Sequence, residues 1–103
     1  MIAMISITYP GDVFKQVVQA FTSPDIPKRP ESIKELSSMG YYDGGGSHAV
    51  FMFDVPDAEL ADFLALQSKR SAFIGARAAG FTSSVHVGQR IGESIQNLMP
   101  MYP

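Results

Sequence analysis

The hydrophobic pattern at the start of the chain is that of a strand followed by a helix. Residues 1–9 are rich in β-branched side chains, and apolar residues alternate with more polar ones: Ile5, Ile7 and Tyr9 against Met4, Ser6 and Thr8. This period of two predicts a strand with one more apolar face. Pro10 and Gly11 break the pattern, and apolar residues then recur at helical spacing: Val13, Val17, Val18 and Phe21. We therefore expect a helix over about residues 12–22, with Asp12 as its N-cap.

Residues 31–42 have a pattern that fits two structures. Ser32 with Glu35 three residues later could be a capping box, and Ile33, Leu36 and Met39 lie three apart, as in a short helix ending at Gly40. A strand is the preferred interpretation. A Pro-rich segment precedes these residues, and the Tyr41–Tyr42 pair leads into the run Asp43-Gly44-Gly45-Gly46, which is typical of a hairpin turn.

The second arm of this hairpin, residues 48–55, is the clearest strand in the chain. Its centre is Val50, Phe51, Met52 and Phe53, so neither face is polar. A strand of this kind must be covered on both sides.

The remaining residues predict helix, strand and helix. Four acidic residues cluster where the second helix should begin, and Lys69 and Arg70 cluster at its end, as the dipole of a helix favours; the acids are Asp54, Asp57, Glu59 and Asp62. Leu60, Phe63 and Leu64 supply its core stripe. A Gly-containing connection through Phe73, Gly75 and Gly80 leads to a last strand over residues 81–87, in which Val85 and Val87 alternate with Ser84 and His86. Ile91, Ile95, Leu98 and Met99 then predict a short amphipathic helix that Pro100 stops.

Composition limits the classes of protein that the chain can belong to. Its 103 residues, 46% of them hydrophobic, suit one domain over 1–103 with one core. Without cysteine it has no disulfide or zinc-thiolate site, and a net charge of −2 gives no electrostatic footprint for nucleic acid. No apolar run approaches the roughly 20 residues that cross a bilayer. With no Lys or Arg before Lys15, a secretory signal is not expected, and a cytoplasmic location is the default.

The expected order of elements is that of the split βαβ arrangement, an antiparallel sheet with two helices on one face. The other face would leave Val50 and Met52, or Phe51 and Phe53, in water, at a cost of about 1.5–3 kcal/mol for each large side chain. A second copy of the chain is the simplest cover, because a two-fold axis lets one surface serve both partners. We therefore expect a homodimer.

The chain resembles the dimeric α/β-barrel proteins in its order of elements, its length and several short sequence segments. The segments are residues 49–55 followed by Pro-Asp-Ala-Glu-Leu, then Phe73 and the pair Gly80-Phe81. The resemblance covers about residues 1–90. It implies an α+β, ferredoxin-like βαββαβ domain forming a dimeric barrel, to which the C-terminal helix is an addition. Members of that superfamily include cofactor-free monooxygenases and many uncharacterised domains, and this chain matches the active site of none of them.

Candidate site residues are few. His86 should face the bare side of the sheet with Ser84, Ser6 and Thr8, whereas His48 follows the glycine run, where an exposed turn residue is the simplest interpretation. Tyr41 and Tyr42 alternate along their strand, so one faces the core and the other faces outward. Arg77 could meet an anion. Two histidines 38 residues apart, with no other ligand pattern, predict no metal site, and no cofactor is expected.

Two functions fit these residues. The first is a small homodimeric protein that binds a small hydrophobic molecule or acts as an accessory domain. The alternative is a cofactor-free, monooxygenase-like enzyme acting on a small hydrophobic or aromatic substrate. In that enzyme His86 would be the general base, Tyr41 or Tyr42 would orient the substrate and Arg77 would attract an anionic group.

Overall fold

The computed structural model describes residues 1–101; Tyr102 and Pro103, which end the single domain expected over 1–103, lie outside the described residues. The chain is a small antiparallel α+β domain with four strands and three α-helices in the described part. In chain order the elements are β1 (Ile2–Tyr9), the 3-10 turn η1 (Gly11–Val13), α1 (Phe14–Phe21), β2 (Lys34–Asp43), β3 (Gly46–Asp54), η2 (Asp57–Glu59), α2 (Leu60–Gly75), β4 (Thr82–Gly88), α3 (Ile91–Leu98) and η3 (Met99–Met101).

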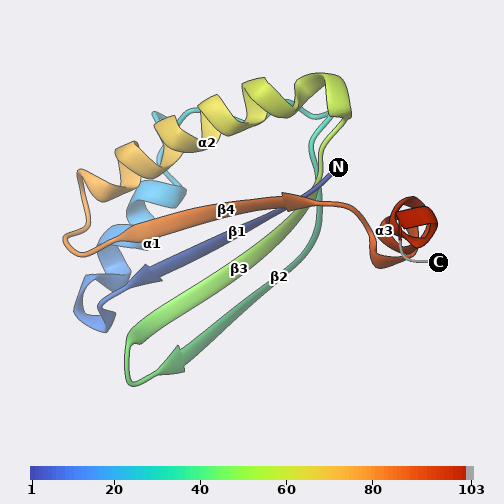
Figure 1. The fold of residues 1–103 in the computed structure, drawn as a ribbon. Coiled ribbons are helices and arrows are strands. Elements are labelled where there is room, and N and C mark those ends of the chain that lie inside the picture. Colours follow the sequence, from blue (N-terminus) through green and yellow to red (C-terminus); the bar gives the residue numbers. More distant parts are fainter. Residues whose placement is uncertain (102–103) are drawn as a thin grey trace.

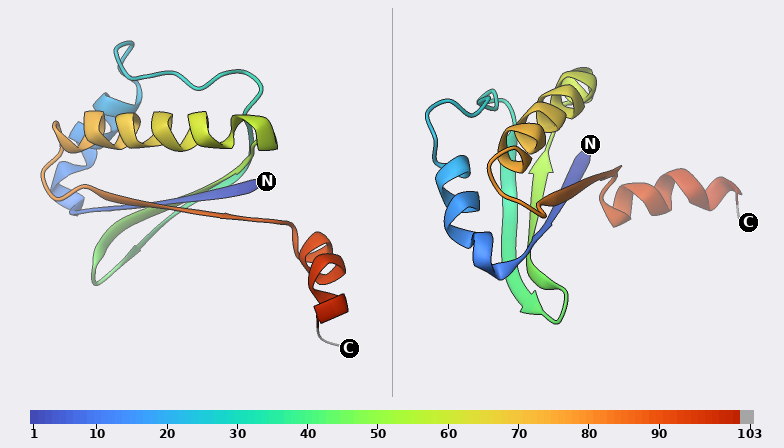
Figure 2. Two further views of the ribbon diagram at one scale, coloured as in Figure 1. Left: turned by 45° about the horizontal axis from the view of Figure 1, so that its top comes forward. Right: turned by 90° about the vertical axis from the view of Figure 1, so that its left-hand side faces the viewer.

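The sheet has the order β2-β3-β1-β4, and every neighbouring pair is antiparallel. Helices α1 and α2 cover one of its faces (Figure 1). Neither covers the other face, which we call the open face. Helix α3 lies beyond the end of β4, away from the two covering helices (Figure 2).

The core is the single layer between the sheet and the two covering helices. Alternate residues of β1 point into it, as the sequence pattern predicted: Ala3, Ile5, Ile7 and Tyr9 are all buried. They pack with Phe53 of β3 against Val17 and Ala20 of α1 and Phe63 and Ile74 of α2. The other residues of β1 are only partly buried, because they face the uncovered side.

Most predicted elements are confirmed, including the strand interpretation of the ambiguous segment, which begins at Lys34. Two details were wrong. Asp12 is not an N-cap, because the chain enters α1 through η1, in which the Val13 amide bonds to the Pro10 carbonyl at 3.1 Å. Helix α2 continues to Gly75, since buried Ile74 extends its core face. Arg70 therefore lies inside the helix, where it is buried and donates to the Pro27 carbonyl.

The hairpin depends on one glycine. Gly46 has φ +119°, and a Cβ there would lie 2.8 Å from the Tyr9 carbonyl oxygen, which is backbone and cannot move aside. Gly46→Ala is expected to lower the free energy of unfolding by about 2–3 kcal/mol in urea denaturation. Gly44→Ala is the matched control, because a Cβ at Gly44 meets no atom within 4 Å. It should change stability by less than about 0.5 kcal/mol. Equal losses for the two variants would contradict this role for Gly46.

Candidate functional site

The open face of the sheet carries its side chains in cross-strand rows, because the strands are in direct register. Listed from β4 through β1 and β3 to β2, the first row is Thr82, Thr8, His48 and Tyr41. The second row is Ser84, Ser6, Val50 and Met39, and the third is His86, Met4, Met52 and Ser37. None of these residues is Lys, Arg, Asp or Glu. The face is therefore polar at the hairpin end and apolar over the middle of β3.

His48 is the best-connected side chain on this face. Its Nδ1 lies 2.9 Å from the Thr8 Oγ1, and its Nε2 lies 2.7 Å from an Asp43 carboxylate oxygen. Its ring stacks on that of Tyr41, with 4.7 Å between centroids and 12° between planes. Only 15% of the side chain is exposed. The expectation of an exposed turn residue was wrong, because β3 already begins at Gly46 and places His48 inside the sheet.

The Asp43 carboxylate, the His48 imidazole and the Thr8 hydroxyl form a chain of hydrogen bonds across three strands. The hydrogen bond from His48, and a second from the Gly45 amide at 2.7 Å, hold the pKa of Asp43 below its ordinary value. The ionised carboxylate accepts a hydrogen bond from Nε2–H, which in the neutral imidazole leaves Nδ1 as the acceptor for the Thr8 hydroxyl. An imidazole held between a carboxylate and a hydroxyl can move a proton to or from a bound molecule.

The pKa of Asp43 gives a direct test of this chain. His48→Phe keeps a ring on Tyr41 but removes both nitrogens, so the pKa of Asp43 should rise toward its ordinary value and stay somewhat low through Gly45. A pH titration of the carboxyl ¹³C signal measures this. Thr8→Val is the control and should leave the pKa of Asp43 low, because Thr8 does not contact the carboxylate. An unchanged pKa in His48→Phe would contradict the assignment.

The same pKa fixes the sign of a stability effect. The pKa of Asp43 is lower in the folded chain than in the unfolded one, so its hydrogen bonds stabilise the fold above the unfolded-chain carboxyl pKa. This contribution disappears as pH falls through the lowered pKa. The stability difference between the natural chain and Asp43→Asn should therefore be present at neutral pH and vanish in acid.

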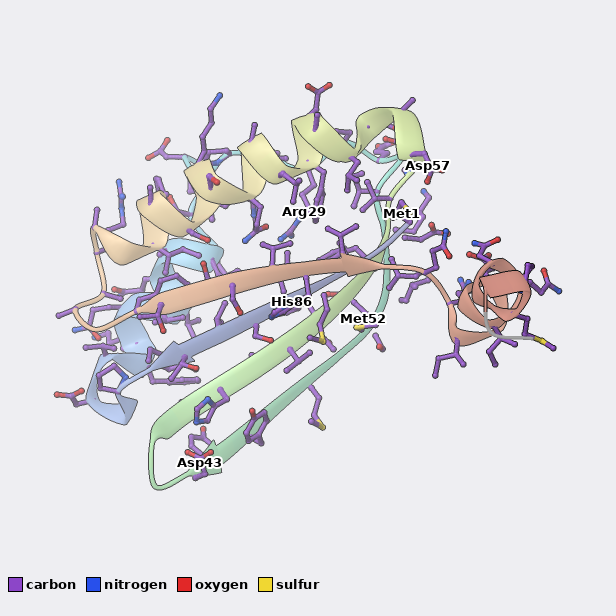
Figure 3. All side chains as sticks on the ribbon, viewed as in Figure 1. Met1, Arg29, Asp43, Met52, Asp57 and His86 are labelled. Carbon is purple, nitrogen blue, oxygen red and sulfur yellow. The ribbon has the colours of Figure 1, made fainter. Side chains whose placement is uncertain are left out.

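The other candidate residues lie apart from the hydrogen-bonded residues Asp43, His48 and Thr8. His86 is two rows away, about 13 Å along the strands, on the far side of β1. It lines a shallow hollow of about 220 Å³ with Ile2, Met4, Met52, Val87, Gly88 and Gln89. Figure 3 shows His86 and Met52 well away from Asp43 at the hairpin tip. The structure thus brings together Tyr41 and His48 but not His86.

Tyr42 and Arg77 belong to other surfaces. Tyr42 pairs with Ser47 in the row that faces the helices, and it is largely exposed. Arg77 donates to the Phe73 carbonyl at 2.8 Å, and its guanidinium lies 3.5 Å from the centroid of the Phe73 ring. These contacts hold Arg77 on the last turn of α2, away from either histidine.

Two of the three hydrogen-bonded residues, Asp43 and Thr8, were not predicted as site residues. A signal for Asp43 was present, because a two-residue turn at Gly44-Gly45 pairs Tyr41 with His48 and leaves Asp43 beside it. Thr8 gave no such signal. Its position opposite His48 depends on the pairing of β1 with β3, which are 40 residues apart at this point.

A hollow of about 360 Å³, larger than the one at His86, lies on the helix side between α2 and the segment before β2. Its lining mixes charged and apolar side chains: Lys28, Pro30, Ile33, Glu59, Asp62, Phe63, Ala65, Leu66 and Lys69. It contains no histidine or hydroxyl group, so the open face is the better candidate for chemistry. Within residues 1–101 no cluster of three or more acidic or histidine side chains could hold a metal ion. No helix in that range is long and apolar enough to span a bilayer.

Comparisons with known proteins give structural likeness only. No family model and no curated protein matches the chain. An unknown protein from Galdieria sulphuraria is 16% identical with a TM-score of 0.42, over 87% of this chain and 46% of that one. A DUF3240 family protein from Shewanella baltica OS155 is 11% identical with a TM-score of 0.35, over 86% of this chain and 92% of that one. The chain therefore spans about half the length of the Galdieria protein, and neither likeness carries a function.

Proposed function

We propose that the chain is a homodimeric binding protein for a small, largely hydrophobic molecule, with the ligand held on the open face beside His48. In this proposal the domain is ferredoxin-like, and two sheets meet face to face as in a dimeric α/β barrel. The strand order and the positions of α1 and α2 on one face support it, since they match the split βαβ arrangement.

One observation carries the proposal: the face with the Asp43–His48–Thr8 chain is also the apolar face that neither α1 nor α2 covers. Val50 and Met52 are only partly buried, and the neighbouring Met39 is largely exposed. A second copy placed here would cover the apolar rows and enclose the polar row, which gives a cavity with a few directed polar groups. Tyr41 and the methionines suit an aromatic or aliphatic ligand, and Thr8 and His48 suit one polar group on it.

The hydrogen-bonded chain also favours a second function, that of a cofactor-free enzyme. In this alternative the general base is His48 in place of His86, because only His48 has both a carboxylate and a hydroxyl partner. Such an enzyme should lose most of its turnover in His48→Phe, whereas a pure binding protein should lose affinity alone. His86→Phe is the control and should retain turnover.

Native mass spectrometry of protein purified from its own host tests the binding function. We expect a species of twice the 11.2 kDa chain mass that retains a small molecule. Thr8→Val should retain less of that molecule while keeping the dimer mass, because it removes a polar contact without changing the apolar rows. A monomer mass at micromolar concentration would overturn the dimer. A dimer that holds no molecule in either protein would support the accessory role in place of binding.

A further inference from the structure

Helix α3 carries an apolar stripe that stays exposed in the part of the chain that the structure describes. Ile91, Ile95 and Met99 recur at i, i+4 and i+8 and therefore lie along one side of the helix, where they are 79%, 51% and 65% exposed. Glu93 and Asn97 lie on the opposite side, and Asn97 donates to the Gln89 side chain at 2.7 Å. The polar side of α3 is thus tied to its own linker, and the apolar side is left uncovered.

A helix this short does not form by propensity alone. Eight residues are fewer than the roughly 12–15 that an isolated helix needs in water, so α3 requires packing on its apolar stripe. Residues 1–101 do not supply it, because half or more of each side chain in the stripe is exposed. Arg90 is extended, with φ −58° and ψ 145°, and α3 projects past the end of β4 toward the side of the open face (Figure 2).

The dimensions of the chain indicate that a large surface is missing its partner. Its radius of gyration is 15.6 Å, against about 13 Å for a folded domain of this length. Its accessible surface is 6,675 Å², about 1,000 Å² more than the roughly 5,700 Å² typical of a monomer of this mass. A standard interface buries about 800 Å² on each partner. The excess is therefore of the size that one stable interface covers.

We propose that α3 is an exchanged arm, whose Ile91, Ile95 and Met99 stripe packs on the open face of a second copy. The apolar hollow at Met4, Met52 and His86 is the seat that this stripe fits, and it lies at the α3 end of the sheet. A two-fold axis lets each copy give an arm and receive one. The arm closes one end of the ligand site, so this inference rests on the proposed homodimer.

A second copy fits this surface better than other partners do. The hollow at Met4, Met52 and His86 is lined without any Lys, Arg, Asp or Glu, and the oppositely charged Asp54 and Lys34 lie side by side in the next row. The stripe on α3 is aliphatic. Two uncharged apolar surfaces of one chain, neither of them covered, complement each other. Glu93 lies on the opposite side of α3 and can stay in water.

Cross-linking tests the exchange directly, because the natural chain has no cysteine. Ile95→Cys and Met52→Cys are made in separate full-length chains, mixed and oxidised, and non-reducing mass spectrometry should show a disulfide joining one chain of each kind. Glu93→Cys mixed with Met52→Cys is the control and should not cross-link, since Glu93 lies on the side of α3 opposite the stripe. A disulfide formed only within one chain that carries both substitutions would overturn the exchange.

A second measurement separates this inference from the dimer itself. Ile95→Glu should raise the dimer dissociation constant by at least about tenfold in sedimentation experiments, and Asn97→Glu, on the opposite side of α3, should leave it unchanged. The natural chain could be a dimer that Ile95→Glu does not weaken and in which no disulfide forms between chains. That result would contradict the exchanged arm but not the homodimer. If the natural chain is a monomer at all concentrations, both proposals fail.

Discussion

Phe53→Ala is expected to lower the free energy of unfolding by about 3–5 kcal/mol, which is a large part of the stability of a domain this size. Phe53 is only 4% exposed and lies at the centre of the core layer. Its ring is within 6.0 Å of the Phe63 ring and 6.4 Å of the Phe51 ring, measured between centroids. Truncation would leave a cavity between β3 and α2 that neighbouring backbone cannot fill.

Phe53→Ala would also remove a contact of a buried cation, the guanidinium of Arg29. The guanidinium of Arg29 lies 4.3 Å from the centroid of the Phe53 ring, and burial lowers the pKa of Arg29 to about 10. Arg29 donates to Gln67 of α2 at 3.0 Å, so it connects the segment before β2 to the helix. Without the aromatic face the cation keeps its desolvation cost but loses an attractive partner, worth about 1–2 kcal/mol of the total.

Urea denaturation at one fixed protein concentration measures the effect. Phe14→Ala is the matched control, because Phe14 is half exposed and should cost only about 1 kcal/mol. Phe53→Leu should cost less than Phe53→Ala, since it refills most of the cavity and loses only the ring contact with Arg29. Similar losses for Phe53→Ala and Phe14→Ala would mean that the core is not centred where the structure places it.

The elements that the sequence predicted are those that local chemistry determines. The hairpin was predictable because the Asp43-Gly44-Gly45-Gly46 run fixes both the turn and the pairing of the strands beside it. The direction of Ile5 and Ile7 into the core followed from a period of two, and the open face followed from the apolar pairs in β3. These features require no knowledge of which distant strands meet.

What the sequence did not predict depends on distant pairing. Thr8 meets His48 only because β1 lies between β3 and β4, and this contact converts an expected turn residue into the centre of the site. The end of α2 was placed too early because Lys69 and Arg70 have the charge expected at a helix end, whereas burial of Ile74 extends the helix to Gly75. Arg70 was expected to be a charge at the helix end, but its guanidinium donates to the loop carbonyl of Pro27 and its side chain is buried.

Val50→Asp is expected to abolish self-association while leaving the chain folded. Val50 is the middle apolar residue of the open face, flanked by Ser6 on β1 and Met39 on β2. In a single chain this position is only partly buried, so a carboxylate there keeps contact with water. In the proposed dimer the two-fold axis would bury two such carboxylates near each other with no cation among the three rows, at a cost of several kcal/mol for each.

This cost corresponds to a rise of about a thousandfold or more in the dimer dissociation constant, which sedimentation velocity over a concentration series measures. Val18→Asp is the matched control. It introduces the same charge at an exposed valine of α1, on the helix layer, and should leave the dimer intact. Because the core lies on the other side of the sheet, Val50→Asp should keep the cooperative urea unfolding of the natural protein, and any loss of helical circular dichroism should be limited to the eight residues of α3. A dimer of unchanged affinity in Val50→Asp would place the interface on another surface, and the ligand site enclosed by two sheets would then have no second wall.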